Sequence, residues 1–577
     1  MRNSEVAKGW TPMRTLAAWS VLALGAGSTL SGMANAAEEA AQKSDAKPTV
    51  VASIDGAEIF AREWIPGDKR SHGGDGLGPV FNDSSCVACH NQGGVGGGGP
   101  ASKNVDIVTA FHAPQQARRR GGSSVQVPVT LPGIVFQSVF GNLDRVAAEQ
   151  AAAAVTAQQA DPAGDVEEQL TAAERAAAQR KKQEEARKQQ MEADRQQLAK
   201  LHPGFAHANS VVLHKDATFA GYQTWRSRVA GMQFGIQQQQ TVVELFQPEA
   251  VEAAPNRTHN GQLLMAQLKQ EVQLAAMRGA RGSARQGNFV ITKSQRNTTA
   301  LFGSGLIDSI PTETLEALEK AQTKNKVISG RLARLKDGSA GRFGWKSQKS
   351  SLSDFVLTAC AVEVGLNVPS HPQAGHPKNA KYRPAGLDLN QAQCDALIDY
   401  IGGLPAPAQR RFADETDRKY IEAGHALFEK VGCADCHVET VGEVAGIFSD
   451  LLLHDMGGEL GDTGSYDVFI PDSTPEGQVV PLASASGQQA PSTKITGATR
   501  QEWRTPPLWG VRDSAPYLHD GRAETLAQAI AMHGGESAAS AQKFFALSDA
   551  ERFQVISFLK SLVAPKPADD RQVASVR

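Results

Sequence analysis

Aromatic side chains are scarce in this sequence. Phenylalanine, tryptophan and tyrosine together make up 6% of the 577 residues, whereas glycine alone contributes 55 residues. Few aromatic rings and many flexible positions predict a loop-rich protein in which some other bulky group fills part of the interior. The length of the chain predicts at least two separate cores.

An excess of charge of either sign is also missing, since 59 basic residues stand against 61 acidic residues. A nucleic-acid-binding protein would carry a basic patch, and a protein held at a membrane surface would carry a polybasic segment. We therefore expect neither kind of partner.

Long hydrophobic runs are missing too, apart from one short stretch near the amino terminus. Residues 16–24 are apolar, Arg14 precedes them, and Ala34-Asn35-Ala36 follows as an A-x-A cleavage site. Glycines directly after the run make it too short to span a bilayer, although a membrane anchor is the alternative. Residues 1–36 are therefore expected to be a signal peptide, with Met13 as an alternative start. The mature protein should be exported, for example to the periplasm, without a membrane span.

Cysteine is rare, and four of the six cysteines belong to two C-x-x-C-H motifs. The motif residues are Cys86, Cys89 and His90 in the first copy and Cys433, Cys436 and His437 in the second. This spacing is the attachment signature of c-type haem, because two thiols bond the two vinyl groups of the porphyrin and the adjoining imidazole reaches the iron. A zinc site would require the four cysteines to converge from distant parts of the chain and would leave both histidines without a role. Two covalent haem c groups are therefore predicted.

The two motif histidines are the predicted proximal iron ligands, and the sixth positions then decide function. An open iron can bind peroxide or dioxygen, whereas a filled one only passes electrons. For the second haem the best candidate is His533. Thr525 can cap a helix that Gly534 ends, and Leu526, Ile530 and His533 share one face of it at i, i+4 and i+7.

Three alternatives to His533 ligation stay open. A lone histidine on an apolar helix face is often an ordinary core residue. Met532 is adjacent on the same helix but points about 100° away, so only one of the two can coordinate. Met456 is a further candidate.

Composition also suggests how the chain is divided. Residues 145–201 are rich in Ala, Gln, Glu, Lys and Arg without a wide apolar stripe, which predicts solvated helices in an insert or, as an alternative, a coiled coil. The predicted segments are a signal peptide (1–36), an amino-terminal haem domain (37–404) containing the insert, a carboxy-terminal haem domain (408–563) and a disordered tail (564–577). The expected fold class is mainly α, with two c-type cytochrome domains in tandem and long loops.

Several further blocks resemble those of a known superfamily. They are residues 75–82, 296–303, 341–346, 451–457, 503–510 and 515–521. Together with the two haem motifs, they resemble the bacterial di-haem cytochrome c peroxidases and their MauG-like relatives. Within that superfamily the chain looks most like the di-haem oxidoreductase family, some of whose members are labelled thiol oxidoreductases. The 145–201 insert has no counterpart in that pattern.

The resemblance implies roles for individual residues. His533 stands where the superfamily supplies the distal ligand of the carboxy-terminal haem, which implies bis-histidine ligation and a lower potential than histidine–methionine ligation. Trp345 matches the tryptophan between the two haems, with an ordinary core position as the alternative. Glu363 resembles the distal acid of the peroxidatic haem, with a surface position as the alternative.

Two further expectations concern metal and ligand positions. Asn297, Ser514 and Pro516 fall where the peroxidases bind calcium between their domains, so a calcium ion is a candidate cofactor. In the peroxidases a histidine soon after the first haem motif often fills its sixth site. Here residues 93–99 are glycine-rich and the next histidine is His112, at a different spacing. An open first haem is therefore favoured, with His112 as the alternative ligand.

The remaining cysteines are Cys360 and Cys394. In an oxidising compartment they are expected to form a disulfide or to lie buried and inert. Because Cys360 is three residues before Glu363, a redox-active thiol near the first haem is a further alternative.

The combined interpretation is a di-haem oxidoreductase of the cytochrome c peroxidase type. Electrons from a small cytochrome or cupredoxin would enter at the carboxy-terminal haem and pass by way of Trp345 to an open amino-terminal haem. There peroxide or dioxygen would be activated with Glu363 as acid–base catalyst. The alternatives are a di-haem oxygenase, and a non-enzymatic electron-transfer cytochrome in which His112 fills the first haem.

Overall fold

The computed structural model describes residues 54–112, 165–232, 235–236, 259–278, 282–287, 289–323, 328–379, 381–464, 466 and 497–565. All of these belong to one compact unit that begins at Ile54. The predicted signal peptide and almost all of the predicted tail lie outside the described residues, as do residues 145–164 of the insert. Among the described residues, no helix is both long and apolar enough to cross a membrane.

The first haem motif lies in a helical region. Helix α2 (Gly56–Ala61) packs against α12 (Gln391–Gly402) and against the short helix α3 (Cys86–Cys89) that carries the motif. A Cβ atom at Gly56 would collide with the carbonyl oxygen of Ala396, so this crossing requires glycine. Helices α9 (Ser304–Ser309), α10 (Thr312–Gln322) and α11 (Leu352–Val362) complete this region.

The second haem motif lies in a similar setting. Helices α13 (Glu415–Lys430) and α16 (Asp549–Ser561) cross closely, and a Cβ atom at Gly424 would collide with the carbonyl oxygen of Gln554. The helices packed around this crossing are α8 (His259–Arg278), α14 (Leu526–Ala531) and α15 (Ala538–Ala546), with the 3₁₀ turns η4 (Cys433–Asp435) and η6 (Gly535–Ser537). In both regions, therefore, the helix that precedes the motif in the chain packs closely against a second helix, and a glycine allows this close contact.

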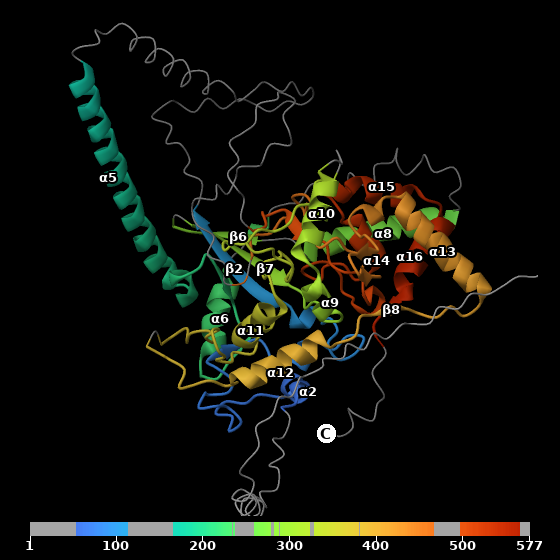
Figure 1. Ribbon diagram of the computed structural model, residues 1–577, viewed down its shortest axis with the longest axis horizontal. Coiled ribbons are helices and arrows are strands. Elements are labelled where there is room, and N and C mark those ends of the chain that lie inside the picture. Colours follow the sequence, from blue (N-terminus) through green and yellow to red (C-terminus); the bar gives the residue numbers. More distant parts are fainter. Residues whose placement is uncertain are drawn as a thin grey trace, which may run out of the picture. The chain divides into compact units, whose positions relative to one another are not determined.

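A five-stranded antiparallel sheet contradicts the expected mainly α class. Its strands, in order, are β3 (Ser210–Val212), β2 (Val105–His112), β7 (Phe289–Arg296), β6 (Gly282–Gln286) and β5 (Gly235–Ile236), and β2, β7 and β6 lie side by side in Figure 1. The register of the central pair runs from Val105 opposite Arg296 to His112 opposite Phe289. The described part of the chain is thus of mixed α/β composition. The division into two tandem haem domains stays a prediction.

The other strands form short two-stranded pairs. They are β1 (Val80–Phe81) with β4 (Asp216–Ala217), β9 (Thr440–Val441) with β10 (Val444–Ala445), β11 (Leu453–Asp455) with β12 (Glu502–Arg504), and β8 (Ala408–Gln409) with β13 (Leu562–Val563). Strand β11 lies beside the second haem motif, because its His454 ring is within 3.6 Å of the Cys436 sulfur.

The predicted solvated insert contains the long helix α5 (Asp165–Ala199), which Figure 1 shows as a single rod. Its described side chains are mostly exposed. Near its end Leu198 is buried in a small core with Phe205, Val229 and Phe289, next to helix α6 (Tyr222–Ala230). The solvated helix is therefore confirmed from Asp165 onward, and its last turn is attached to the sheet.

Candidate haem-binding sites

The second motif presents its histidine in a fixed orientation. Gly432, with a φ of 91°, turns the chain from α13 into η4, and the His437 amide donates to Cys433 O at 3.0 Å. The His437 Nδ1 donates to Phe448 O at 2.9 Å, which leaves Nε2 free to bind iron. Burial lowers the pKa of His437 to about 4, so the imidazole is neutral, as a metal ligand must be.

His533 lies in the same cavity as His437. Thr525 caps α14 through its hydroxyl, which accepts from the Gln528 amide at 3.2 Å. The helix ends at Ala531, three residues before the predicted stop at Gly534. The His533 Nδ1 donates to Ala529 O at 2.7 Å, so its Nε2 is also free. Both histidines line a cavity of about 290 Å³, and burial lowers the pKa of His533.

The two methionine alternatives differ in whether they line the cavity of the second motif. Met532 is buried in the hydrophobic core and is not among the residues that line the cavity. Met456 does line it, and its sulfur lies 3.7 Å from the Ser537 hydroxyl oxygen. The cavity thus brings His533 and Met456, but not Met532, to the second motif.

The first motif shows the same local arrangement. Ser85 caps α3 by accepting from the Ala88 amide at 3.3 Å, and the His90 amide donates to Cys86 O at 3.0 Å. The His90 Nδ1 donates to Gly97 O at 3.2 Å. Burial lowers the pKa of His90 to about 4, against the opposing effect of hydrogen bonds to the Gly97 and Thr299 backbones, so this imidazole too is neutral.

The glycine-rich run 93–99 has a structural role in this arrangement. The Gln92 and Gly98 backbones pair, and a Cβ atom at Gly97 would collide with the carbonyl oxygen of Gln92. Only glycine can therefore close this tight loop, whose Gly97 carbonyl orients His90. The run departs from the peroxidase pattern in the sequence, and the structure gives it a physical reason.

Glu363 lies close to the first motif. It follows the last residue of α11, and its Oε2 accepts from the Asn82 side-chain amide at 2.6 Å. Burial, together with the nearby Asp83 and Glu363 carboxylates, raises the pKa of the Cys89 thiol to about 12. A carboxylate of fixed orientation therefore lies near the first motif, where the resemblance implies a distal acid.

Tyr466 is a neighbour of Glu363 that sequence reasoning missed. Its ring packs against Val105, Ile107, Val212 and Val362, and its phenol hydrogen-bonds Glu363. Burial, and after it the negative charge of Glu363, raises the pKa of this phenol far above its usual range. No local pattern marks the residue, because Tyr466 and Glu363 come together only through folding.

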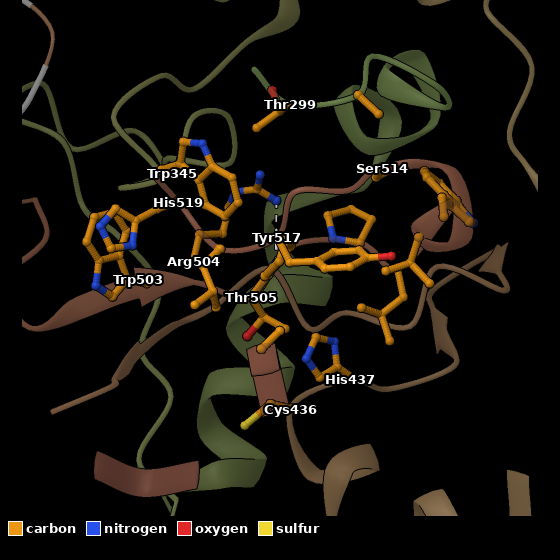
Figure 2. Close-up of a pocket in the computed structure, with 18 of the residues that line it drawn as sticks. Thr299, Trp345, Cys436, His437, Trp503, Arg504, Thr505, Ser514, Tyr517 and His519 are labelled. Carbon is orange, nitrogen blue, oxygen red and sulfur yellow. Dashed lines mark hydrogen bonds between the residues drawn. The ribbon is translucent and has the colours of Figure 1, made fainter. Parts of the chain in front are cut away.

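Trp345 lies at the cavity of the second motif. Its indole N–H donates to Asn297 O at 2.9 Å, and its ring meets His519 edge-on at a centroid distance of 6.5 Å. His519 in turn stacks on Trp503 at 3.8 Å. Figure 2 shows these three rings gathered along one wall, with His437 and Cys436 on another.

The segment after Asn297 connects the two motifs. The Thr299 backbone is within hydrogen-bonding reach of His90, and Thr299 also lines the cavity that holds His437. Trp345 is anchored to the carbonyl of Asn297, two residues away from Thr299. The predicted inter-haem position of Trp345 is therefore next to a segment that contacts the surroundings of both motif histidines.

Comparison with known proteins gives partial sequence matches. Residues 487–562 match the family described as "Di-haem oxidoreductase, putative peroxidase". Over 152 residues the chain is 32% identical to hydrazine synthase subunit gamma of Kuenenia stuttgartiensis and, equally, to the methylamine utilization protein MauG of Methylorubrum extorquens. These partial matches support a likeness to the di-haem peroxidase and MauG-like family.

The extent of these likenesses is limited. Each 152-residue match covers 25% of this chain, and 41% and 35% of the two relatives, less than half of either. Among solved structures, a hydrazine synthase of K. stuttgartiensis is 19% identical with a TM-score of 0.26 and covers 57% of this chain and 94% of its own. A MauG-like protein associated with microbial copper homeostasis is 17% identical with a TM-score of 0.22, covering 51% and 89%. TM-scores this low do not indicate a shared overall fold.

The calcium site stays a prediction. Asn297, Ser514 and Pro516 all line the cavity of the second motif. The Asn297 amide nitrogen donates to Gly99 O at 3.0 Å and to Asn104 Oδ1 at 2.9 Å, and Ser514 Oγ donates to Gly510 O at 2.9 Å. These bonds account for the donors on the Asn297 and Ser514 side chains, and they leave the calcium prediction untested.

Two further predictions concern the first motif. Cys360 and Cys394 are both buried in the core and both free thiols, so the alternative of a disulfide is not realised. His112 ends β2, but its side chain lies outside the described part of the chain, and its role as an alternative ligand stays untested.

Proposed function

We propose that this chain is an exported di-haem c oxidoreductase of the peroxidase type, in which electrons enter at the carboxy-terminal site and are used at the amino-terminal site. The observation that carries the proposal is the difference between the two motif histidines. His437 has a second neutral imidazole, that of His533, in its cavity. The first motif instead has a carboxylate and a phenol beside it, Glu363 and Tyr466.

The residues present fit a c-type haem at both motifs. Each motif offers two thiols and a neutral imidazole whose Nδ1 is held by a backbone carbonyl, at Gly97 and at Phe448. A haem bound there would supply an iron that changes between the ferrous and ferric states and that, where no second side chain binds it, could bind a small oxidant. Cys86, Cys89 and His90 would hold one group; Cys433, Cys436, His437 and His533 would hold the other.

Glu363 is suited to proton transfer at the first site. Its Oε2 accepts a hydrogen bond from Asn82, which fixes the carboxylate, and the Tyr466 phenol adds a second proton-bearing group. A positioned carboxylate of this kind can take a proton from one oxygen of a peroxide and return it to the other. These contacts support the acid–base role of Glu363.

Trp345 is suited to lie on the path between the sites. It lines the cavity of His437, and its anchor Asn297 is two residues before Thr299, which reaches His90. A small cytochrome or cupredoxin in the periplasm would be the electron donor, and peroxide or dioxygen the acceptor. Peroxide is preferred because Glu363 supplies the proton transfer that cleavage of an O–O bond requires.

The test is a low-temperature EPR spectrum of the oxidised protein with both haems attached. We expect one high-spin and one low-spin signal in the wild type. His533→Ala should convert the low-spin signal to high-spin, whereas Met456→Ala, from the same cavity, should not. Two low-spin signals that persist on partial reduction would contradict an open first site and favour an electron carrier. Turnover with dioxygen but not with peroxide would favour an oxygenase.

A further inference from the structure

A buried histidine outside the predicted ligand set lies next to the second motif. His454, in β11, is 2% exposed and stands between two carboxylates. Its Nε2 is 2.8 Å from Asp450 Oδ2, and its Nδ1 is 2.9 Å from Glu536 Oε2. A ring that faces an acceptor at both nitrogens is an imidazolium, because only the protonated form has two N–H donors.

The charge of this histidine is consistent with its partners. Burial lowers the pKa of His454, but the bonds with Asp450, Cys436 and Glu536 outweigh burial and raise it to about 12. We call Asp450, His454 and Glu536 the His454 network. With two carboxylates and one imidazolium, it carries one net negative charge.

Both carboxylates of the His454 network are anchored elsewhere. Asp450 Oδ2 accepts from the Gln322 side chain at 2.7 Å, and Oδ1 accepts from the Leu452 amide at 2.9 Å. Glu536 accepts from the Ser329 amide at 3.0 Å and from the Ser329 hydroxyl at 2.6 Å. The network therefore has little freedom to move, and its charge-assisted bonds are strong because the site is buried.

One end of the network holds the proximal segment. The Asp450 amide donates to Cys436 O at 2.9 Å, and the Cys436 sulfur lies 3.6 Å from His454 Nδ1. Cys436 directly precedes His437. The Phe448 carbonyl, which orients His437, lies two residues before Asp450. Asp450 and His454 thus brace both the attachment thiol and the proximal ligand.

The other end holds the distal segment. Glu536 belongs to η6, which begins two residues after His533. At the start of η6, Gly535 has a φ of 54°, and a Cβ atom there would collide with the carbonyl oxygen of Asp455 in β11. The segment that carries His533 is therefore packed directly on the strand that carries His454.

We propose that the His454 network is a positioning device for the second haem site: it ties the segment of Cys436 and His437 to the segment of His533, and so keeps the two histidines in place. The inference rests on the proposed function in taking His437 and His533 as iron ligands. The negative charge of the His454 network beside Cys436 would also favour the more positive ferric state of the iron. Loss of one carboxylate should therefore loosen His533 and raise the midpoint potential of this haem.

The same atoms are less well suited to binding a metal ion. The ligand atoms of Cys436, Asp450 and His454 lie within 4.8 Å of one another. However, Cys436 is needed for haem attachment, and both nitrogens of His454 already face carboxylates. A metal would have to displace one of these bonds and compete with the haem for the sulfur.

The test compares variants of the holoprotein by EPR and by redox titration of the second haem. Glu536→Gln should lose part of the low-spin signal, gain high-spin signal, and shift the midpoint potential upward. Glu536→Asp keeps the charge and should stay close to the wild type. Ser329→Ala removes one donor to Glu536 and should shift the same readouts less. Glu439→Gln, an exposed carboxylate two residues after His437, is the matched control and should change nothing.

The outcomes separate this inference from the proposed function. If Glu536→Gln keeps the wild-type spectrum and potential while His533→Ala still changes them, the positioning role is overturned and the ligand assignment stands. If His533→Ala also leaves the spectrum unchanged, the ligand assignment fails, and the inference fails with it. Should Glu536→Gln not fold, the Ser329→Ala and Glu536→Asp readouts decide: wild-type values in Ser329→Ala would overturn the inference.

Discussion

The two haem motifs share their local construction and differ in what the rest of the chain brings to them. In each, a helix with a glycine at its crossing, Gly56 or Gly424, leads towards the motif, and a backbone carbonyl holds the histidine Nδ1. Beside the second motif stand His533 and the His454 network; beside the first stand Glu363 and Tyr466. The attachment motif is thus repeated, and under the proposed function the two copies have different roles because their surroundings differ.

The largest effect is expected from removing one motif at a time, which tests whether the two haem sites are distinct. Cys86→Ala with Cys89→Ala should lose one covalent haem and the high-spin signal, whereas Cys433→Ala with Cys436→Ala should lose one haem and the low-spin signal. The physical reason is that each pair of thiols holds its own porphyrin. Haem content per chain by mass spectrometry, together with EPR, checks both. Loss of both haems from either double variant would show that the sites do not assemble independently.

A smaller effect is expected at the acid beside the first motif. Glu363→Gln keeps the size of the side chain but removes the proton-accepting carboxylate, so peroxide turnover should fall roughly 10²–10⁴-fold. The low-spin signal of the second haem should be unchanged, because the residue lies on the side of the first motif. Steady-state assays with a reduced small cytochrome measure the loss. Glu63→Gln, an exposed carboxylate, is the control and should retain full turnover.

The smallest effect is expected for an ion pair that joins the strands beside the second motif. Arg331 pairs through its backbone with Leu453 in β11 and makes an ion pair with Glu502 in β12 at 2.5 Å. Burial raises the pKa of Glu502, but the hydrogen bonds and charge of Arg331 outweigh it and hold the pKa below 4.5. Glu502→Gln should therefore lower the free energy of unfolding by about 2 kcal/mol at neutral pH.

The sign of the pH dependence comes from the lowered pKa. A carboxyl group whose folded pKa lies below its unfolded value of 4.5 contributes stability above that pH and loses it as the pH falls through the folded pKa. The difference between wild type and Glu502→Gln should thus be constant near neutrality and shrink below pH 4.5. Unfolding followed at the Soret band over a pH series measures it. A difference that persists unchanged in acid would argue against the ion pair as its cause.

Parts of this structure could be predicted from local sequence alone. The cap at Thr525 and the exposed helix from Asp165 depend on neighbouring residues, and both are confirmed. The five-stranded sheet was missed because its central pair joins residues 105–112 to residues 289–296, and pairing over such a distance leaves no local mark. The same holds for His454, whose partner Glu536 lies far along the chain.

The sequence by itself determined where two haems are predicted to attach, because the thiols and the imidazole of each motif are neighbours in the chain and their spacing matches the porphyrin edge. Only the tertiary structure decided what surrounds each iron site. His533, Glu363, Tyr466 and the His454 network reach the motifs from distant segments. The groups that orient the motif histidines are backbone carbonyls, which carry no side-chain signature and acquire a direction only when the chain has folded.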